Sequence, residues 1–403
     1  MRSPVRDGGG RLRAGQPVWR AATAAVAGLL LLGPTACSAP GSAGGGKGRT
    51  GGVDGASQSA AGRSARPTPA EPEVTFPWRP GRPQLGMNVY WADDPSDSEA
   101  VVRAKARRVV DYLITVDANS VALAFPFFTA GPTASSVFAT SATPSARRVG
   151  VALDEFSRRG LRATLKPLLD EKALLAVSRR SWRGSIQPAN RDAWFASYRK
   201  LLVPYLHVAQ RSRARTFVIG TELSSLESDP RWGALAGQAK GIFRADIAYS
   251  VNWDSYVSRP NRMPVDEVGV DAYFPLEVDD DAPTSVLVAG WNRWLDRRAV
   301  GPLPDLSFSE VGAPAEDGAY RHPAAWGSTR GHALNLAVQA RWFTAACQVA
   351  RQRKMAGLYW WKVDFHDDPV RADPVHDKHD SFLGRPGEDA IQSCFSAWGS
   401  STR

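Results

Sequence analysis

Short apolar or β-branched runs alternate with longer helical patterns from Leu85 onward, and this alternation constrains the fold more than any other feature of the sequence. It is typical of successive βα units, which build a parallel sheet. No repeat of fixed period accompanies it, which argues against solenoids and propellers. The strand-like runs cover residues 85–91, 120–127, 162–169, 216–223, 246–253, 267–274, 306–312 and 357–363. These eight strands predict an α/β fold, a single (β/α)8 TIM barrel over residues 81–403.

The first 36 residues have the composition of an export signal. Five arginines precede an apolar run over residues 21–32 that is too short to span a membrane comfortably. The string Pro34-Thr35-Ala36-Cys37 resembles the bacterial lipobox, in which small residues precede a cysteine that is lipidated and becomes residue one. Pro34 stands where that motif prefers leucine. We expect residues 1–36 to be a lipoprotein-like signal and Cys37 to be lipidated, with cleavage near Ala36 and free secretion as the alternative.

Residues 37–80 are dominated by Gly, Ser, Ala and Pro, with almost no large apolar side chain before Val74. Such a segment cannot bury enough apolar surface to offset its ordering entropy. We expect a disordered tether that holds the domain off a membrane or through a wall layer. The chain is then an exported lipoprotein on the surface of a bacterial cell.

The net charge of +10 does not indicate a nucleic-acid partner. The signal and the tether carry more than half of it, which leaves +4 on residues 81–403, and no basic run there is interleaved with aromatic residues. Such a domain lacks the electrostatic footprint of a nucleic-acid-binding protein. We expect membrane contact only through the N-terminal lipid, and a monomeric protein.

Each predicted strand ends in residues unsuited to a packed interior, and in a barrel all these ends open onto one face, where barrel enzymes keep their chemistry. Glu222 closes one apolar strand, and Glu310 closes another, three strands later. Cleavage of a glycosidic bond with retention needs one carboxylic acid to protonate the leaving oxygen. It also needs a second carboxylate, about 5–5.5 Å away, to attack the anomeric carbon. The two glutamates are therefore a candidate catalytic pair.

Fourteen tryptophans are a heavy allotment, and sugar rings present apolar faces that stack on aromatic planes while their hydroxyls seek fixed polar partners. The candidate substrate-binding residues at strand ends and in loops over the same face are Asn88, Trp91, Lys166, Trp182, Asn252, Trp253, Tyr273, Trp360 and Trp361. For each polar member, a structural hydrogen bond at the end of a strand is an equally good account.

A specific resemblance runs through these strand ends. The strings Phe217-Val218-Ile219-Gly220-Thr221-Glu222, Tyr249-Ser250-Val251-Asn252-Trp253-Asp254, Gly269-Val270-Asp271-Ala272-Tyr273-Phe274-Pro275-Leu276, Ser309-Glu310-Val311-Gly312 and Trp360-Trp361 resemble glycoside hydrolase family 113 of clan A. Trp182-Arg183-Gly184 and Trp194-Phe195 extend the match upstream, so that it spans nearly the whole domain.

The resemblance implies endo-acting β-mannanase activity by double displacement, with the general acid/base after the fourth strand and the nucleophile after the seventh. These roles fall on Glu222 and Glu310. Many relatives in the clan have Asn before the acid/base, where this chain has Thr221, so the contact of that Asn with the substrate 2-hydroxyl does not carry over. Tyr273 is a candidate donor to Glu310, and a rim aromatic is the alternative for it.

Neither a cofactor nor a metal is expected. The histidines and acids over residues 366–380 include one His-x-x-His, without the Cys ligands or the helical Glu of a zinc protease motif, and a polar loop beside the cleft explains them better. Cys347 and Cys394 lie in helices that are neighbours in a barrel. In an oxidising compartment they can pair, and two buried free thiols are the alternative.

Two other functions remain open beside the hydrolysis of a β-linked polysaccharide or oligosaccharide. The chain is a non-catalytic, glycan-binding surface lipoprotein that kept the aromatic cleft, or it trims the producer's own envelope or matrix polysaccharide. Barrel fold and acid pair are shared by many specificities, so the sequence does not choose the sugar.

Overall fold

The computed structural model describes residues 71–260, 262–325, 332–374 and 379–401. Its strands are β1 (Gln84–Tyr90), β2 (Ser120–Thr129), β3 (Val137–Phe138), β4 (Arg162–Leu169), β5 (Thr216–Thr221), β6 (Asp246–Asn252), β7 (Glu267–Asp271), β8 (Leu306–Val311) and β9 (Gly357–Asp364). Its α-helices are α1 (Glu99–Thr115), α2 (Ala146–Arg158), α3 (Lys172–Val177), α4 (Arg191–Arg211), α5 (Arg231–Ile242), α6 (Trp253–Ser258), α7 (Thr284–Asp296), α8 (Leu336–Gln352) and α9 (Pro386–Ser400).

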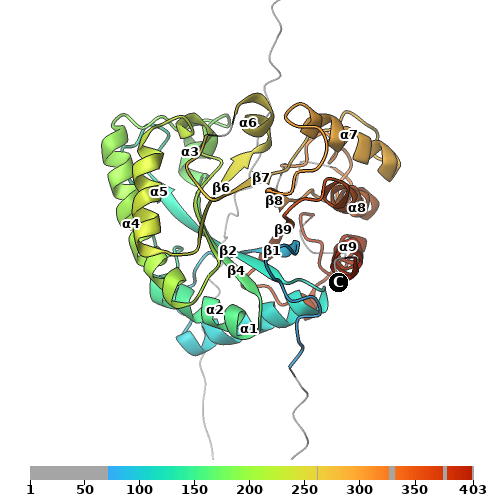
Figure 1. The fold of residues 1–403 in the computed structure, drawn as a ribbon, viewed down its shortest axis with the longest axis horizontal. Coiled ribbons are helices and arrows are strands. Elements are labelled where there is room, and N and C mark those ends of the chain that lie inside the picture. The colour runs from blue at the N-terminus through green and yellow to red at the C-terminus, as the bar shows by residue number, and fades with distance from the viewer. Residues whose placement is uncertain (1–70, 261, 326–331, 375–378, 402–403) are drawn as a thin grey trace, which may run out of the picture. The chain divides into compact units, whose positions relative to one another are not determined.

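Eight parallel strands close into a barrel, which confirms the predicted fold. They follow one another in the order β1-β2-β4-β5-β6-β7-β8-β9, and β9 pairs with β1 to complete the ring. Each predicted run forms one of these strands. The sequence did not predict β3, which pairs antiparallel with the end of β2. Figure 1 shows the helices around the strands, with α4 and α5 on one side and α8 and α9 on the other.

Several helices, among them α1 and α4, begin at a residue whose side chain caps them. Ser98 accepts a hydrogen bond from the backbone of Val101 at the start of α1, and Asn190 does the same for Ala193 at the start of α4. Such caps satisfy backbone donors that have no partner within the helix. No helix among the described residues is long and apolar enough to cross a membrane.

Polar side chains and small residues together line the barrel interior. Alternate residues of β4 point inward and include Arg162 and Lys166, two buried cations. Glycines on other strands allow neighbouring side chains to pack closely inside the barrel. A methyl group on Gly269 of β7 would lie 2.5 Å from Cβ of Ser309, and one on Gly86 of β1 would lie 2.2 Å from the ring of Tyr359.

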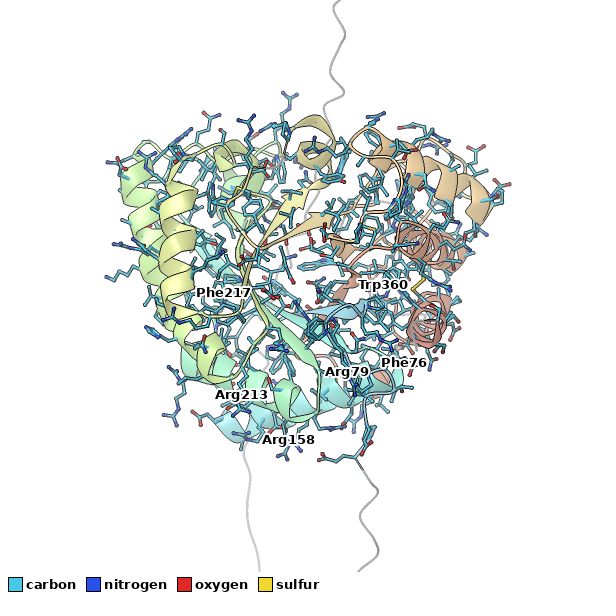
Figure 2. All side chains as sticks on the ribbon, viewed as in Figure 1. Phe76, Arg79, Arg158, Arg213, Phe217 and Trp360 are labelled. Carbon is cyan, nitrogen blue, oxygen red and sulfur yellow. A yellow bond between two sulfur atoms is a disulfide. The ribbon has the colours of Figure 1, made fainter. Side chains whose placement is uncertain are left out.

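The ordered chain begins before residue 81, which corrects the expected end of the tether. The guanidinium of Arg162 lies 4.9 Å from the centre of the Trp78 ring, and that of Arg215 lies 5.6 Å from it, so Trp78 covers the N-terminal ends of β4 and β5. Asn119 donates to the carbonyl oxygen of Phe76 at 3.0 Å. Figure 2 labels Phe76, which packs against Gly399 of α9. The composition of residues 37–80, taken as a whole, hid the apolar cluster between Val74 and Trp78.

Cys347 of α8 and Cys394 of α9 form a disulfide, drawn as a yellow bond in Figure 2. The bond joins two helices that pack against each other at the point where the barrel closes between β9 and β1. It encloses a loop of 47 residues.

Replacing both cysteines by serine should lower the free energy of unfolding by about 2–4 kcal/mol, because a cross-link over a loop of this length restricts the unfolded chain. Chemical denaturation of the variant and of the oxidised wild type measures the difference, and the reduced wild type is the matched control. The reduced wild type and the serine variant should unfold at the same midpoint. Equal midpoints for the oxidised wild type and the variant would contradict this expectation.

Candidate active site

Glu222 directly follows β5, in a backbone conformation that β-sheet residues do not adopt. Its φ angle is +55°, in the left-handed region that costs energy for a residue with a side chain. Its amide donates to the carbonyl oxygen of Ser250 on β6 at 2.8 Å, which fixes this turn. The residue is 8 % exposed. A strained backbone conformation therefore places the Glu222 side chain at the C-terminal end of the barrel strands.

Glu310 lies near the end of β8 and is held through both carboxylate oxygens. Oε1 is 2.6 Å from Nζ of Lys166, and Oε2 accepts a hydrogen bond of 2.8 Å from the hydroxyl of Tyr273. The residue is 3 % exposed. Tyr273 was predicted as a donor to Glu310, and the structure contains this hydrogen bond. An ammonium and a hydroxyl donor both favour the ionised form of a carboxyl group.

Asp271 is a third carboxyl group in the same cleft, on β7 beside Glu310. It is fully buried. Oδ1 accepts a hydrogen bond from Ser309 at 2.7 Å and lies 3.5 Å from Nζ of Lys166, whereas Oδ2 has no hydrogen-bond partner among the described residues. Burial, followed by the charge of Glu310, raises the pKa of Asp271 to about 7, although Lys166 opposes this. Burial and the neighbouring Glu310 therefore oppose the ionised form of Asp271, and Lys166 supports it.

Arg183 is the cation that contacts Glu222. It lies in a 3-10 turn (Arg183–Ser185) between α3 and α4. Its Nη1 donates to Oε2 of Glu222 at 2.9 Å, and its Nε lies 3.2 Å from Oε1 of Glu171. Nε also donates to the carbonyl oxygen of Leu169, at the end of β4. A loop therefore carries the cation that faces Glu222, whereas a barrel strand carries the one that faces Glu310.

The two glutamates have different electrostatic surroundings, although each has one cation at hydrogen-bonding distance. Burial raises the pKa of Glu222 well above its usual value, the charge of Asp271 raises it further, and the guanidinium of Arg183 opposes both. Glu310 receives an ammonium and a hydroxyl donor at close range. Two carboxyl groups whose surroundings differ in this way can serve as acid and nucleophile in one reaction.

Three of the predicted aromatic binding residues lie at the C-terminal end of the barrel, namely Trp361, Trp253 and Trp182. The ring of Trp361 has its centre 5.9 Å from Nζ of Lys166 and packs with Ala124, Leu168 and Tyr90. Trp253 is half-buried against Phe274 and Trp294, and Trp182 is half-buried beside Arg183. Trp326, which the sequence places in a loop over the same face, lies outside the described residues.

Trp91 and Trp360 were predicted to bind substrate, and the structure contradicts both predictions. Both are fully buried. Trp91 stacks on Phe365 at 4.3 Å between ring centres, and Trp360 lies 4.7 Å from Phe343 of α8, the side to which Figure 2 places it. Successive residues of a strand point to opposite faces. Trp361 points toward Lys166 inside the barrel, and its neighbour Trp360 therefore points outward to the helices.

Asn88 and Asn252 have structural partners. Asn88 is fully buried and donates to the carbonyl oxygens of Ser309 at 2.9 Å and Trp360 at 3.3 Å, which ties β1 to β8 and β9. Asn252 accepts a hydrogen bond from the amide of Trp253 and donates to Asp254, both at the start of α6. The structural account therefore suffices for both side chains.

The sequence did not identify Arg183 and Glu171 as site residues, and Asp271 stood only inside one of the quoted strings. Arg183 lay inside one of the quoted strings, and this was the only signal for it. Arg183 and Glu222 are 39 positions apart in the sequence and meet only in the folded protein. A periodic sequence pattern cannot predict such a contact.

Two histidines after β9 contact neighbouring segments, one on helix α1 and one in the loop after β8. His366 lies 2.8 Å from Nζ of Lys105, and His379 lies 2.6 Å from Oε1 of Glu316. Residues 375–378 of that stretch are outside the described residues. Among those that are described, no cluster of three or more His, Cys, Asp or Glu side chains has the arrangement of a metal site.

Comparisons with known proteins agree with this geometry. The model of Glycoside Hydrolase Family 113 matches residues 96–380, which is well over half of the chain. A solved GH113 β-1,4-mannanase has the same fold, with a TM-score of 0.66 at 18% identity over 78% of this chain and 99% of its own. The GH113 β-mannanase of Alicyclobacillus acidocaldarius gives 0.63 at 22% identity, over 79% and 98%. A search of curated proteins found no match.

Replacing Arg183 by methionine should raise the pKa of Glu222 further, because the guanidinium is the group that opposes burial and Asp271. A ¹³C NMR titration of glutamate-labelled protein measures the change, with the Glu222→Gln variant to identify the signal. Arg183→Lys keeps the charge and is the matched control, for which a smaller shift is expected. A titration midpoint for Glu222 that stays in place or falls in Arg183→Met would refute this account of the site.

Proposed function

The chain belongs to glycoside hydrolase family 113, and we propose that it is a retaining, endo-acting enzyme that cleaves β-1,4-mannan-like polysaccharide by double displacement. The observation that carries the mechanism is the unequal environment of the two glutamates. Glu310 is held by Lys166 and Tyr273, whereas burial and Asp271 favour the protonated form of Glu222. The mannan specificity is supported by the solved GH113 β-1,4-mannanases that share the fold.

In the first step, a carboxylate oxygen of Glu310 attacks the anomeric carbon as the glycosidic bond breaks. The departing oxygen takes the proton of Glu222, so that no alkoxide has to leave. In the second step, the Glu222 carboxylate removes a proton from water, the water oxygen bonds to the anomeric carbon, and the ester electrons return to Glu310. Two inversions give net retention.

The proposed substrate contacts follow from the surroundings of the acids. Trp361 stacks on one sugar ring beside Lys166, and Trp253 and Trp182 line more distant positions. The substrate is a polysaccharide or an oligosaccharide, and the enzyme acts as a monomer. Neither step of the reaction calls for a redox group.

Glu310→Ala should lower the release of reducing ends from β-1,4-mannan at least ~1000-fold, because no other carboxylate replaces the nucleophile. A reducing-end assay with product analysis measures rate, stereochemistry and cleavage pattern together. Glu277→Ala is the matched control, since this side chain is 72% exposed, and it should keep wild-type activity. Full activity in Glu310→Ala would exclude the assigned role.

The same assay over a panel of glycans separates the alternatives. Release from mannan supports the proposed specificity. Release only from the producer's own envelope or matrix polysaccharide would replace it with the second candidate substrate. Binding without release from any glycan would indicate the non-catalytic surface lipoprotein.

We further propose that the protein is exported and anchored to the cell surface through a lipid on Cys37. The disulfide between Cys347 and Cys394 supports this location, because such bonds persist in oxidising compartments outside the cytosol. Cys37 and the signal itself lie outside the described residues.

Cys37→Ser should move the protein from the membrane fraction to the soluble exported fraction, since a single polar substitution removes the only acceptor for the lipid. Fractionation of producing cells followed by immunoblotting measures the distribution. Ser38→Ala, at the neighbouring position, should stay in the membrane fraction. A wild-type protein found only in the medium would instead support cleavage near Ala36 and free secretion.

A further inference from the structure

We propose that Lys166 is a positioning residue for the nucleophile: it holds Glu310 ionised and oriented, while Asp271 and Ser309 hold Lys166 in place. The inference rests on the proposed function, because it concerns the residue that attacks the sugar. It extends that function by assigning a role to a buried lysine that was expected to bind substrate hydroxyls.

Lys166 is a cation in the interior of the barrel and is only 1% exposed. A buried ammonium is strongly unfavourable unless anions compensate it. Burial lowers the pKa of Lys166, but Asp271 and then Glu310 raise it, and the net result lies above the usual value. The two carboxyl groups beside it therefore favour the charged form of Lys166.

The distances identify Glu310 as the partner that receives this charge. Nζ is 2.6 Å from Oε1 of Glu310, a short charge-assisted hydrogen bond, and 3.5 Å from Oδ1 of Asp271. Ser309 donates to the same oxygen of Asp271 at 2.7 Å. Asp271 is thus fixed by a neutral donor and faces the ammonium from the side.

Few other charged or titratable groups surround Lys166 and Glu310, and each comes from a known element of the barrel. Lys166 on β4 faces Glu310 on β8, Asp271 on β7 and, at longer range, Glu222 after β5. Arg183 acts on the same three carboxyl groups from its loop, and Tyr273 donates to Glu310 from the end of β7. Trp361 of β9 lies over the ammonium as a neutral aromatic face.

Lys166 and Tyr273 therefore have different tasks. Both fix the orientation of Glu310, one through each oxygen. Only Lys166 brings a positive charge next to a carboxyl group that is surrounded by two others. Without that charge, Glu310 would share a buried site with Asp271 and Glu222, and like charges in such a site favour protonation. A protonated Glu310 cannot attack the anomeric carbon.

The role of Lys166 is consistent with both chemical steps. When Glu310 bonds to the anomeric carbon, its negative charge disappears, and one appears on Glu222, which has given its proton to the departing oxygen. When water attacks and the ester bond breaks, the electron pair returns to Glu310 beside the ammonium, and the proton of water goes to Glu222. Lys166 keeps its proton throughout.

The barrel interior is built to admit this side chain. The cavity beneath Lys166 has a volume of about 30 Å³ and is lined by small residues of the facing strands, among them Gly269, Ser250 and Ser307. A larger residue in place of Gly269 would displace Ser309, which fixes Asp271.

Lys166→Met should move the acidic limb of the kcat/KM profile to higher pH, because Glu310 then takes up a proton more readily. With an activated aryl β-mannoside as substrate, kcat/KM should fall at least ~1000-fold at acidic pH and about 10-fold at alkaline pH. Lys166→Arg keeps a charge and is the matched control. Its acidic limb should stay at the wild-type position even where its rate falls.

Equal loss of activity in Lys166→Met at every pH, with an unmoved limb, would mark a merely structural residue and overturn the proposal. A pH profile of kcat/KM in Lys166→Met that equals that of the wild type would also overturn the proposal. If the wild type itself cleaves no mannoside, the proposed specificity fails, and a measurement without turnover still tests Lys166. In a ¹³C NMR titration of glutamate-labelled protein, with Glu310→Gln to identify the signal, the midpoint of Glu310 must rise in Lys166→Met. An unmoved midpoint overturns the proposal.

Discussion

Three carboxyl groups share one buried cleft in this barrel, and their mutual repulsion is the constraint on which the rest of the site depends. Glu222, Asp271 and Glu310 are each less than a tenth exposed. They cannot all be ionised there unless cations compensate them. Lys166 and Arg183 do so from opposite sides, one on a strand and one on a loop. Each glutamate has one cation at hydrogen-bonding distance, and burial together with Asp271 outweighs that cation at Glu222.

The barrel makes this arrangement possible because its interior alternates long polar side chains with glycine and serine. Lys166 of β4 reaches Glu310 of β8, and the cavity beside it is lined in part by Gly269, Ser250 and Ser307. At the opposite end, Arg162 of the same strand lies under Trp78, so the N-terminal segment of the ordered domain covers the end that is remote from the cleft. Strand β4 thus contributes a cation to each end of the barrel.

The sequence predicted the fold because alternation between strand and helix patterns is a local property, and all eight barrel strands lie where it indicated. It also located Glu222 and Glu310 at the ends of strands. It did not distinguish Trp360 from its neighbour Trp361, since the face to which each points depends on register, and the pairing of β8 with β9 shifts at this level of the barrel. Arg183 could not be assigned, because only the folded loop brings it to Glu222.

The most direct test of this account is to trap the covalent intermediate with a 2-fluoro sugar and to locate the label by mass spectrometry of peptides. The account predicts one glycosyl group per protein, esterified to Glu310 in the peptide that contains β8, and loss of labelling in Glu310→Gln. A label on Glu222 or Asp271, or turnover of substrate with inversion and no covalent species, would contradict the division of roles between the two glutamates.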